Sequence, residues 1–205
     1  MPRKKFFRLT TEQQAILIQS SNFLLNSPRL YQNPHPELSG LKGPADNFGN
    51  MSFMEFMHAD TYFNAFRRNK RPEALTSFLA AMYRSDRDFN AEDWQSSKVM
   101  ERSRKLRKVP NMHKQSLVVW FSSCKRQLSS RNPNVFSGGN QEESNKKPTS
   151  PNWHNILFEV AGPKMGDIHQ VAKQNIHTVF AYLDREIKDA KRKAKELEKI
   201  RSKSR

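Results

Sequence analysis

The sequence predicts an all-α fold, with a compact multi-helix domain that carries a long basic C-terminal helix. Apolar residues recur at spacings of three and four from residue 10 onward, as amphipathic helices require. Proline and glycine divide these stretches into helix-length segments. No useful run alternates apolar and polar residues as a strand would, and no repeat of 20 to 50 residues is present. A chain of 205 residues therefore predicts one modest core with an extension.

The composition combines a real core with a strong positive charge. The chain has 36% hydrophobic residues, 14 Phe and 3 Trp, while 36 Lys and Arg against 20 Asp and Glu give a net charge of +16. Such a charge favours contact with nucleic acid, an anionic membrane surface or an acidic protein, without choosing among them. A single cysteine excludes an internal disulfide framework.

The start of the chain is basic and is followed by polar residues 10–14, not by the apolar stretch of a signal peptide. No segment approaches the roughly 20 apolar residues of a membrane span. We therefore expect a cytoplasmic protein without a transmembrane segment. Residues 1–9 are expected to form a basic arm, and residues 10–137 the main helical core.

The core begins with a helix that Thr10 or Thr11 can cap and that ends near Asn26, before Ser27 and Pro28. The prolines and glycines of residues 28–49 then predict a long loop over the core. Ser52 and Glu55 have the spacing of a capping box, and a broad apolar face follows. A second helix begins near Pro72, so these two helices are expected to form a packed hairpin. Their apolar positions are Phe53, Phe56, Met57, Phe63 and Phe66 in the first helix, and Leu75, Phe78, Leu79 and Met82 in the second.

Asn90 and Asp93 predict the start of a helix that becomes strongly basic and ends at Pro110. Asn111 can cap the next helix, which we expect to be central because its apolar residues share one face. They are Leu117, Trp120, Phe121, Cys124 and Leu128. The aromatic cluster of the preceding hairpin is likewise interpreted as core rather than as a binding groove.

Residues 138–151 lack strongly hydrophobic side chains and predict a flexible polar linker or loop. Residues 152–187 are expected to form helices that pack on the core, the first ending at Gly162 and Pro163. Asp167 is predicted to cap the last and longest helix, whose apolar positions alternate spacings of four and three like a coiled-coil seam. Residues 188–205, with nine Lys or Arg and three Asp or Glu, form a charged helical extension. The seam consists of Ile176, Phe180, Leu183, Ile187, Ala190, Ala194 and Leu197.

No pattern predicts catalysis. The six histidines have no recognised metal-ligand spacing, although His169 and His177 could share a helix face. Cys124 lies on an apolar stripe and is expected to be a buried small hydrophobe. The seven glycines form neither a phosphate loop nor a dinucleotide fingerprint, and no serine occupies a nucleophile elbow. We therefore expect a non-enzyme without catalytic, cofactor-binding or metal-binding residues.

Two surfaces are candidates for binding a macromolecule. The exposed part of the seam, with its neighbouring lysines, predicts protein binding through Ala190, Lys191, Ala194, Lys195 and Leu197. The basic helix could instead neutralise phosphates without reading sequence, through Lys98, Arg102, Arg104, Lys105, Arg107 and Lys108. The sequence does not choose an oligomeric state.

Several segments resemble small tail-region proteins of Bacteroidetes phages and prophages. They are residues 41–56 (Leu-Lys-Gly-Pro-Ala-Asp-Asn-Phe-Gly-Asn-Met-Ser-Phe-Met-Glu-Phe), 80–84 (Ala-Ala-Met-Tyr-Arg), 120–124 (Trp-Phe-Ser-Ser-Cys), 133–136 (Pro-Asn-Val-Phe), 153–162 and the helix ending in Tyr182 and Leu183. The resemblance spans residues 9–187 and implies a tail assembly role, chaperone-like or structural, near the tail tube or the tape-measure protein. It implies the host cytoplasm, with incorporation into the virion as an alternative, and supplies no catalytic residues. The basic C-terminal extension departs from it.

Overall fold

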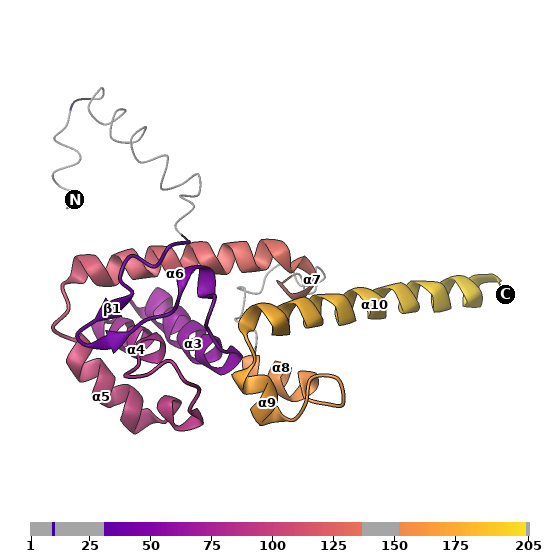
Figure 1. Ribbon diagram of the computed structural model, residues 1–205. Coiled ribbons are helices and arrows are strands. Elements are labelled where there is room, and N and C mark those ends of the chain that lie inside the picture. Colours follow the sequence, from indigo (N-terminus) through magenta and orange to yellow (C-terminus); the bar gives the residue numbers. More distant parts are fainter. Residues whose placement is uncertain (1–9, 11–30, 137–151, 204–205) are drawn as a thin grey trace.

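A computed structural model describes residue 10, residues 31–136 and residues 152–203. The predicted N-terminal arm, most of the first predicted helix and the polar segment 138–151 lie outside the described residues. Within them the all-α prediction is confirmed, since the only strands among them are two residues long (Figure 1). No helix in this part of the chain has an apolar stretch long enough to cross a membrane.

The segment before the first described helix is more regular than the predicted loop. Strands β1 (Glu37–Leu38) and β2 (Leu41–Lys42) pair in antiparallel register, and the 3-10 helix η1 (Asp46–Phe48) follows. The turn places Ser39 and Gly40 at φ 52° and 74°, a tight left-handed turn that joins strands too short to show alternation. The expectation that this segment covers the core is correct, because Leu38, Leu41, Phe48 and Met51 are buried.

The predicted hairpin is α3 (Phe53–Asn69) followed by α4 (Pro72–Met82), and all nine predicted apolar positions are buried. The Ser52 hydroxyl accepts from the Glu55 amide at 3.2 Å, as the capping prediction requires. The Glu55 carboxylate does not complete the box, because it pairs with two arginines. Lys70, at φ 55°, ends α3 in the left-handed conformation, and Pro72 takes the first turn of α4.

The next boundaries differ slightly from the prediction. Asn90 caps the 3-10 helix η2 (Ala91–Trp94), and α5 (Ser96–Leu106) begins only after it. Pro110 rather than Asn111 is the N-cap of α6 (Asn111–Arg131), and the short α7 (Pro133–Phe136) follows. The predicted apolar stripe of α6, including Cys124, is fully buried, so its central position is confirmed.

The C-terminal part contains α8 (Trp153–Val160), α9 (Ile168–Lys173) and α10 (Ile176–Lys203). Asp167 caps α9 in a capping box with Gln170, so the prediction that it caps the longest helix is wrong. The helix is interrupted between α9 and α10 because the backbone there forms hydrogen bonds with the segment at the start of α3 and does not continue the helical pattern. Phe53 N donates to Gln174 O at 2.9 Å, and Ile176 N donates to Met51 O at 3.0 Å. His169 and His177 therefore belong to different helices.

The core is one aromatic cluster shared by both parts of the chain. The Phe56 ring lies 6.0 Å from Phe121, 5.3 Å from Trp153 and 5.5 Å from Phe180, measured between ring centroids. These rings come from α6, α8 and α10, and they pack on α3. The described C-terminal helices thus pack on the main core, and α10 extends away from it on the side opposite the α5–α6 connection (Figure 1).

Candidate functional site

Helix α10 changes environment along its length. Ile176 and Phe180 are buried, Leu183 and Ile187 are half-buried, and the seam positions Ala190, Ala194 and Leu197 are exposed. Every residue from 190 to 202 is exposed, including Leu197 at 60% and Ile200 at 64%. At 1.5 Å per residue, this exposed part is roughly 20 Å long. The apolar seam of α10 is therefore buried in the core at its start and exposed to solvent at its end.

Polar contacts hold the first half of α10 in place. The Asp184 carboxylate accepts from Asn134 N at 2.7 Å and from Asn134 Nδ2 at 3.2 Å, so it caps α7 from outside. Lys164 Nζ lies 2.8 Å from Glu186 Oε1. Lys191 Nζ donates to Asn134 Oδ1 at 3.1 Å. These contacts fix the direction in which the exposed half leaves the core.

All five predicted partner-binding residues lie in the exposed half, but they occupy two faces. With 100° between successive residues, Ala190, Ala194 and Leu197 fall on one stripe, whereas Lys195 lies about 130° from the middle of that stripe. Lys191, despite its exposure, also contacts Asn134. The small side chains of the two alanines leave room for close approach of another helix.

The predicted basic surface of α5 loses one of its members. Arg102 is only 5% exposed, and its Nε donates to Ala80 O at 2.8 Å. Its guanidinium also donates to the Asp93 carbonyl and faces the Asp93 carboxylate. The expectation that Arg102 belongs to an exposed face is therefore wrong, because it ties α5 to α4 and η2. The other predicted residues remain exposed: Lys98, Arg104, Lys105, Arg107 and Lys108.

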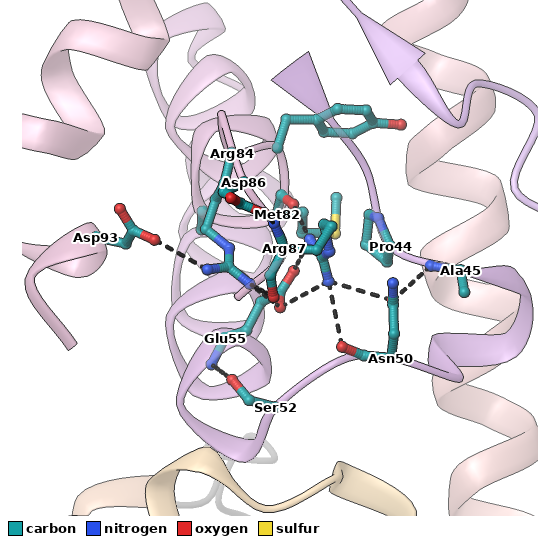
Figure 2. Close-up of polar contacts among 12 residues, drawn as sticks. Pro44, Ala45, Asn50, Ser52, Glu55, Met82, Arg84, Asp86, Arg87 and Asp93 are labelled. Atoms are coloured by element: carbon teal, nitrogen blue, oxygen red, sulfur yellow. Dashed lines mark hydrogen bonds and ion pairs between the residues drawn. The ribbon is translucent and has the colours of Figure 1, made fainter. Parts of the chain in front are cut away.

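A buried ionic network surrounds Glu55 (Figure 2). Arg87 binds this carboxylate with both terminal nitrogens, at 2.8 Å and 2.9 Å, and Arg84 Nη2 lies 3.4 Å from it. Arg84 Nη1 also contacts Asp93 at 2.9 Å and donates to the Asp88 carbonyl at 2.8 Å. Burial raises the pKa of Glu55, while the two arginines act in the opposite direction. Each charge faces an opposite charge inside the fold, so the arrangement joins α3 to the segment after α4 and leaves no free acid or base.

The histidines and the cysteine offer no catalytic arrangement in the described part of the chain. No group of three or more metal-binding side chains is found there. Burial raises the pKa of the Cys124 thiol to about 12, so it remains an un-ionised core side chain at neutral pH. His35 and His113 approach one another, with 3.0 Å between His35 Nε2 and His113 Nδ1. They join the N-terminal loop to the start of α6.

His58 gives the fold a predicted pH dependence. Burial, with a further contribution from His154, lowers its pKa to about 4, whereas an unfolded histidine titrates near 6.5. A lowered folded-state pKa means that stability is present above about pH 6.5 and is lost as the pH falls toward 4. The free energy of unfolding of the unmodified protein should fall by about 2–3 kcal/mol between pH 6.5 and pH 4 as a result, and His58→Gln should abolish this decrease. Urea unfolding at several pH values measures it, and parallel pH curves for the two proteins would contradict this role.

Sequence reasoning missed a second charged feature at the turn between α3 and α4. Arg67, Arg68, Lys70 and Arg71 are all exposed there, beside a pocket between this turn and α6. The run Arg-Arg-Asn-Lys-Arg at residues 67–71 was a readable signal, but only folding places it near the α5–α6 connection. No protein-family model, curated protein or solved structure matches the chain.

Proposed function

We propose that this protein is a non-catalytic assembly protein of a phage-like tail that binds another tail component, with the tape-measure protein as the preferred partner. The observation that carries the proposal is the exposed half of α10. A helix that continues its apolar seam beyond the core presents a surface that a partner helix can cover. The resemblance to tail-region proteins supplies the choice of partner.

The chemistry of the exposed half fits a helical partner with acidic flanks. Leu197 provides the largest apolar side chain of the stripe, and Ala190 and Ala194 permit a short distance between helix axes. Lysines on both sides of the stripe can pair with carboxylates, which favours association and sets orientation. Because α10 begins inside the core, its exposed half is presented in a fixed direction, which lowers the entropic cost of binding.

Removing residues 189–205 is expected to leave the core folded and to abolish capture of the tape-measure protein. Two double substitutions distinguish the contribution of the apolar stripe from that of the overall charge. Ala194→Gln with Leu197→Gln should weaken capture by about tenfold or more, because both changes place polar amides on the contact stripe. Glu196→Gln with Lys199→Gln lies on the opposite face and leaves the net charge unchanged, so capture should persist.

The measurement is co-purification of the full chain and each variant with the co-expressed tape-measure protein, with thermal unfolding as the folding control. Equal capture by the truncated and full chains would overturn the role of α10. Detection of the chain in purified particles would distinguish a structural virion protein from a chaperone that stays in the host cytoplasm.

Sequence-independent nucleic-acid binding is the second candidate, favoured by the five exposed cations of α5 and the connection after it. Arg104→Glu, Lys105→Glu and Lys108→Glu should weaken binding similarly for unrelated DNA and RNA sequences, and affinity should fall steeply with salt. Arg102 is excluded from this set because its substitution would disturb the core. Absence of binding by the full chain at low salt would remove this candidate.

A further inference from the structure

A pocket of about 490 Å³ lies where the α3–α4 turn meets the start of α6. Its apolar wall includes Phe66, Pro72, Leu75 and Val118, and its volume falls within the roughly 300–1,000 Å³ of ligand pockets. Its lining residues come from α3, α4, the turn between them and the first half of α6. The projecting half of α10 extends on the side opposite the α5–α6 connection, where α6 begins (Figure 1). It is therefore separate from the partner surface proposed above.

The rim of this pocket is positively charged. Arg67 and Lys70 line it, and Arg68 and Arg71 are exposed in the same turn. None of these four takes part in an ion pair with another described residue, and no acidic residue is among those that line the pocket. Cations in the last turn of α3 stabilise the helix end, which accounts for Arg67 and Arg68. Lys70 and Arg71 lie beyond the last residue of α3, so stabilisation of the helix end does not account for their charges.

The start of α6 adds to the positive potential. Both α4 and α6 begin beside the pocket, with Pro72 and Asn111 in its lining. Their N-caps, Arg71 and Pro110, make no side-chain capping hydrogen bond. The first turn of α6 contains no acidic residue, whereas Glu73 lies in the first turn of α4 and offsets the partial positive charge there. The apolar wall thus lies between these cations and the N-terminus of α6.

We infer that this pocket binds a short acidic segment of a protein, which inserts one bulky apolar side chain between flanking carboxylates. The wall takes the apolar side chain, and Arg67 and Lys70 pair with the carboxylates. The amides of Asn111 and Gln115, also in the lining, can bond the peptide backbone. The protein then has two binding sites, one at each end.

The aromatic geometry favours a peptide over a nucleic acid. Base binding needs an open ring face for stacking. Phe63 and Phe66 are only 2% and 8% exposed. Arg67 lies over the Phe63 ring at 5.9 Å from its centroid, and Lys70 lies over the Phe66 ring at 5.5 Å. The pocket therefore offers apolar edges and charge, but no free stacking platform.

The test is fluorescence anisotropy of the full chain with a labelled pentapeptide, Asp-Glu-Phe-Glu-Asp, at low ionic strength. Binding is expected, and replacing the peptide's Phe with Ala should weaken it by about tenfold or more. Arg67→Glu with Lys70→Glu should also weaken binding by at least about tenfold. Lys193→Glu with Lys199→Glu makes the same change of charge on α10 and should leave affinity within about twofold.

Gln115→Trp provides a second variant, because this exposed residue lines the pocket and the larger ring would fill it without altering the charge. It should weaken binding even if the double charge reversal impairs folding. The chain lacking residues 189–205 should bind the peptide normally, which separates this site from the α10 proposal. No binding by the full chain, equal binding of the Phe and Ala peptides, or tighter binding of an oligonucleotide of equal charge that is lost in Arg67→Glu with Lys70→Glu would each overturn the inference.

Discussion

Replacing Arg84 with methionine is expected to lower the free energy of unfolding by about 3–5 kcal/mol, as removal of one partner from a buried ion pair does. Arg84 is 1% exposed and contacts the carboxylates of both Glu55 and Asp93. Its guanidinium also lies 5.0 Å from the centroid of the Trp94 ring. Methionine fills much of the volume but leaves Glu55 with Arg87 as its remaining cation. Urea unfolding monitored by circular dichroism measures the loss.

Arg68→Met is the matched control, because it makes the same substitution at an exposed position of α3 that forms no ion pair with another described residue. It should change the free energy of unfolding by no more than about 0.5 kcal/mol. If Arg84→Met were as mild as this control, the network would not contribute to stability. Glu55 would then be compensated by Arg87 alone.

Replacing Trp153 with alanine is expected to destabilise the fold by about 3–5 kcal/mol and to release α8 from the core. The indole packs against the rings of Phe56 and Phe180, with centroids at 5.3 Å and 5.4 Å. Its Nε1 donates to Asp60 Oδ2 at 2.8 Å, in a carboxylate that is completely buried and also contacts Lys125. The substitution thus creates a cavity and removes a donor from a buried charge.

Hydrogen exchange combined with urea unfolding tests this prediction. Amides of α8 and of the first turns of α10 should exchange faster in Trp153→Ala, and capture through α10 should weaken because its base is no longer fixed. Trp153→Phe should cost less, about 1–2 kcal/mol, since it keeps an aromatic ring in the core and loses the hydrogen bond and only part of the indole volume. Phe158→Ala, a residue 62% exposed on the same helix, should have little effect. Unchanged exchange in α8 after Trp153→Ala would contradict this account of how the C-terminal helices dock.

Most of the described helices could be predicted because each is amphipathic and has a local signal at one end. The Ser52 cap, Pro72 in a first turn and the stripe around Trp120 depend on residues close together in the chain, so the sequence alone can show them. The prediction failed at Asp167 because the interruption after α9 is caused by backbone bonds to Met51 and Phe53, which lie more than one hundred residues earlier.

The candidate sites divide in the same way. The exposed half of α10 follows from a seam that is longer than the core can cover, and the sequence contains both the seam and its charges. The pocket beside the α3–α4 turn required three segments to meet, and no local pattern encodes that meeting. The sequence also does not show which charged side chains are exposed. Arg102 and Arg104 look equivalent in the sequence, yet Arg102 is buried and Arg104 is exposed.

The sequence by itself determined an all-α protein with a strong positive charge, a central helix around Trp120 and a C-terminal helix whose seam continues past the core. These properties depend on composition and on periodicity along single helices. The tertiary structure decided which charges are paired inside the fold, as for Glu55 with Arg84 and Arg87, and which cations surround an open pocket. The physical reason is that burial and ion pairing depend on distances between segments far apart in the chain, which helical periodicity does not specify.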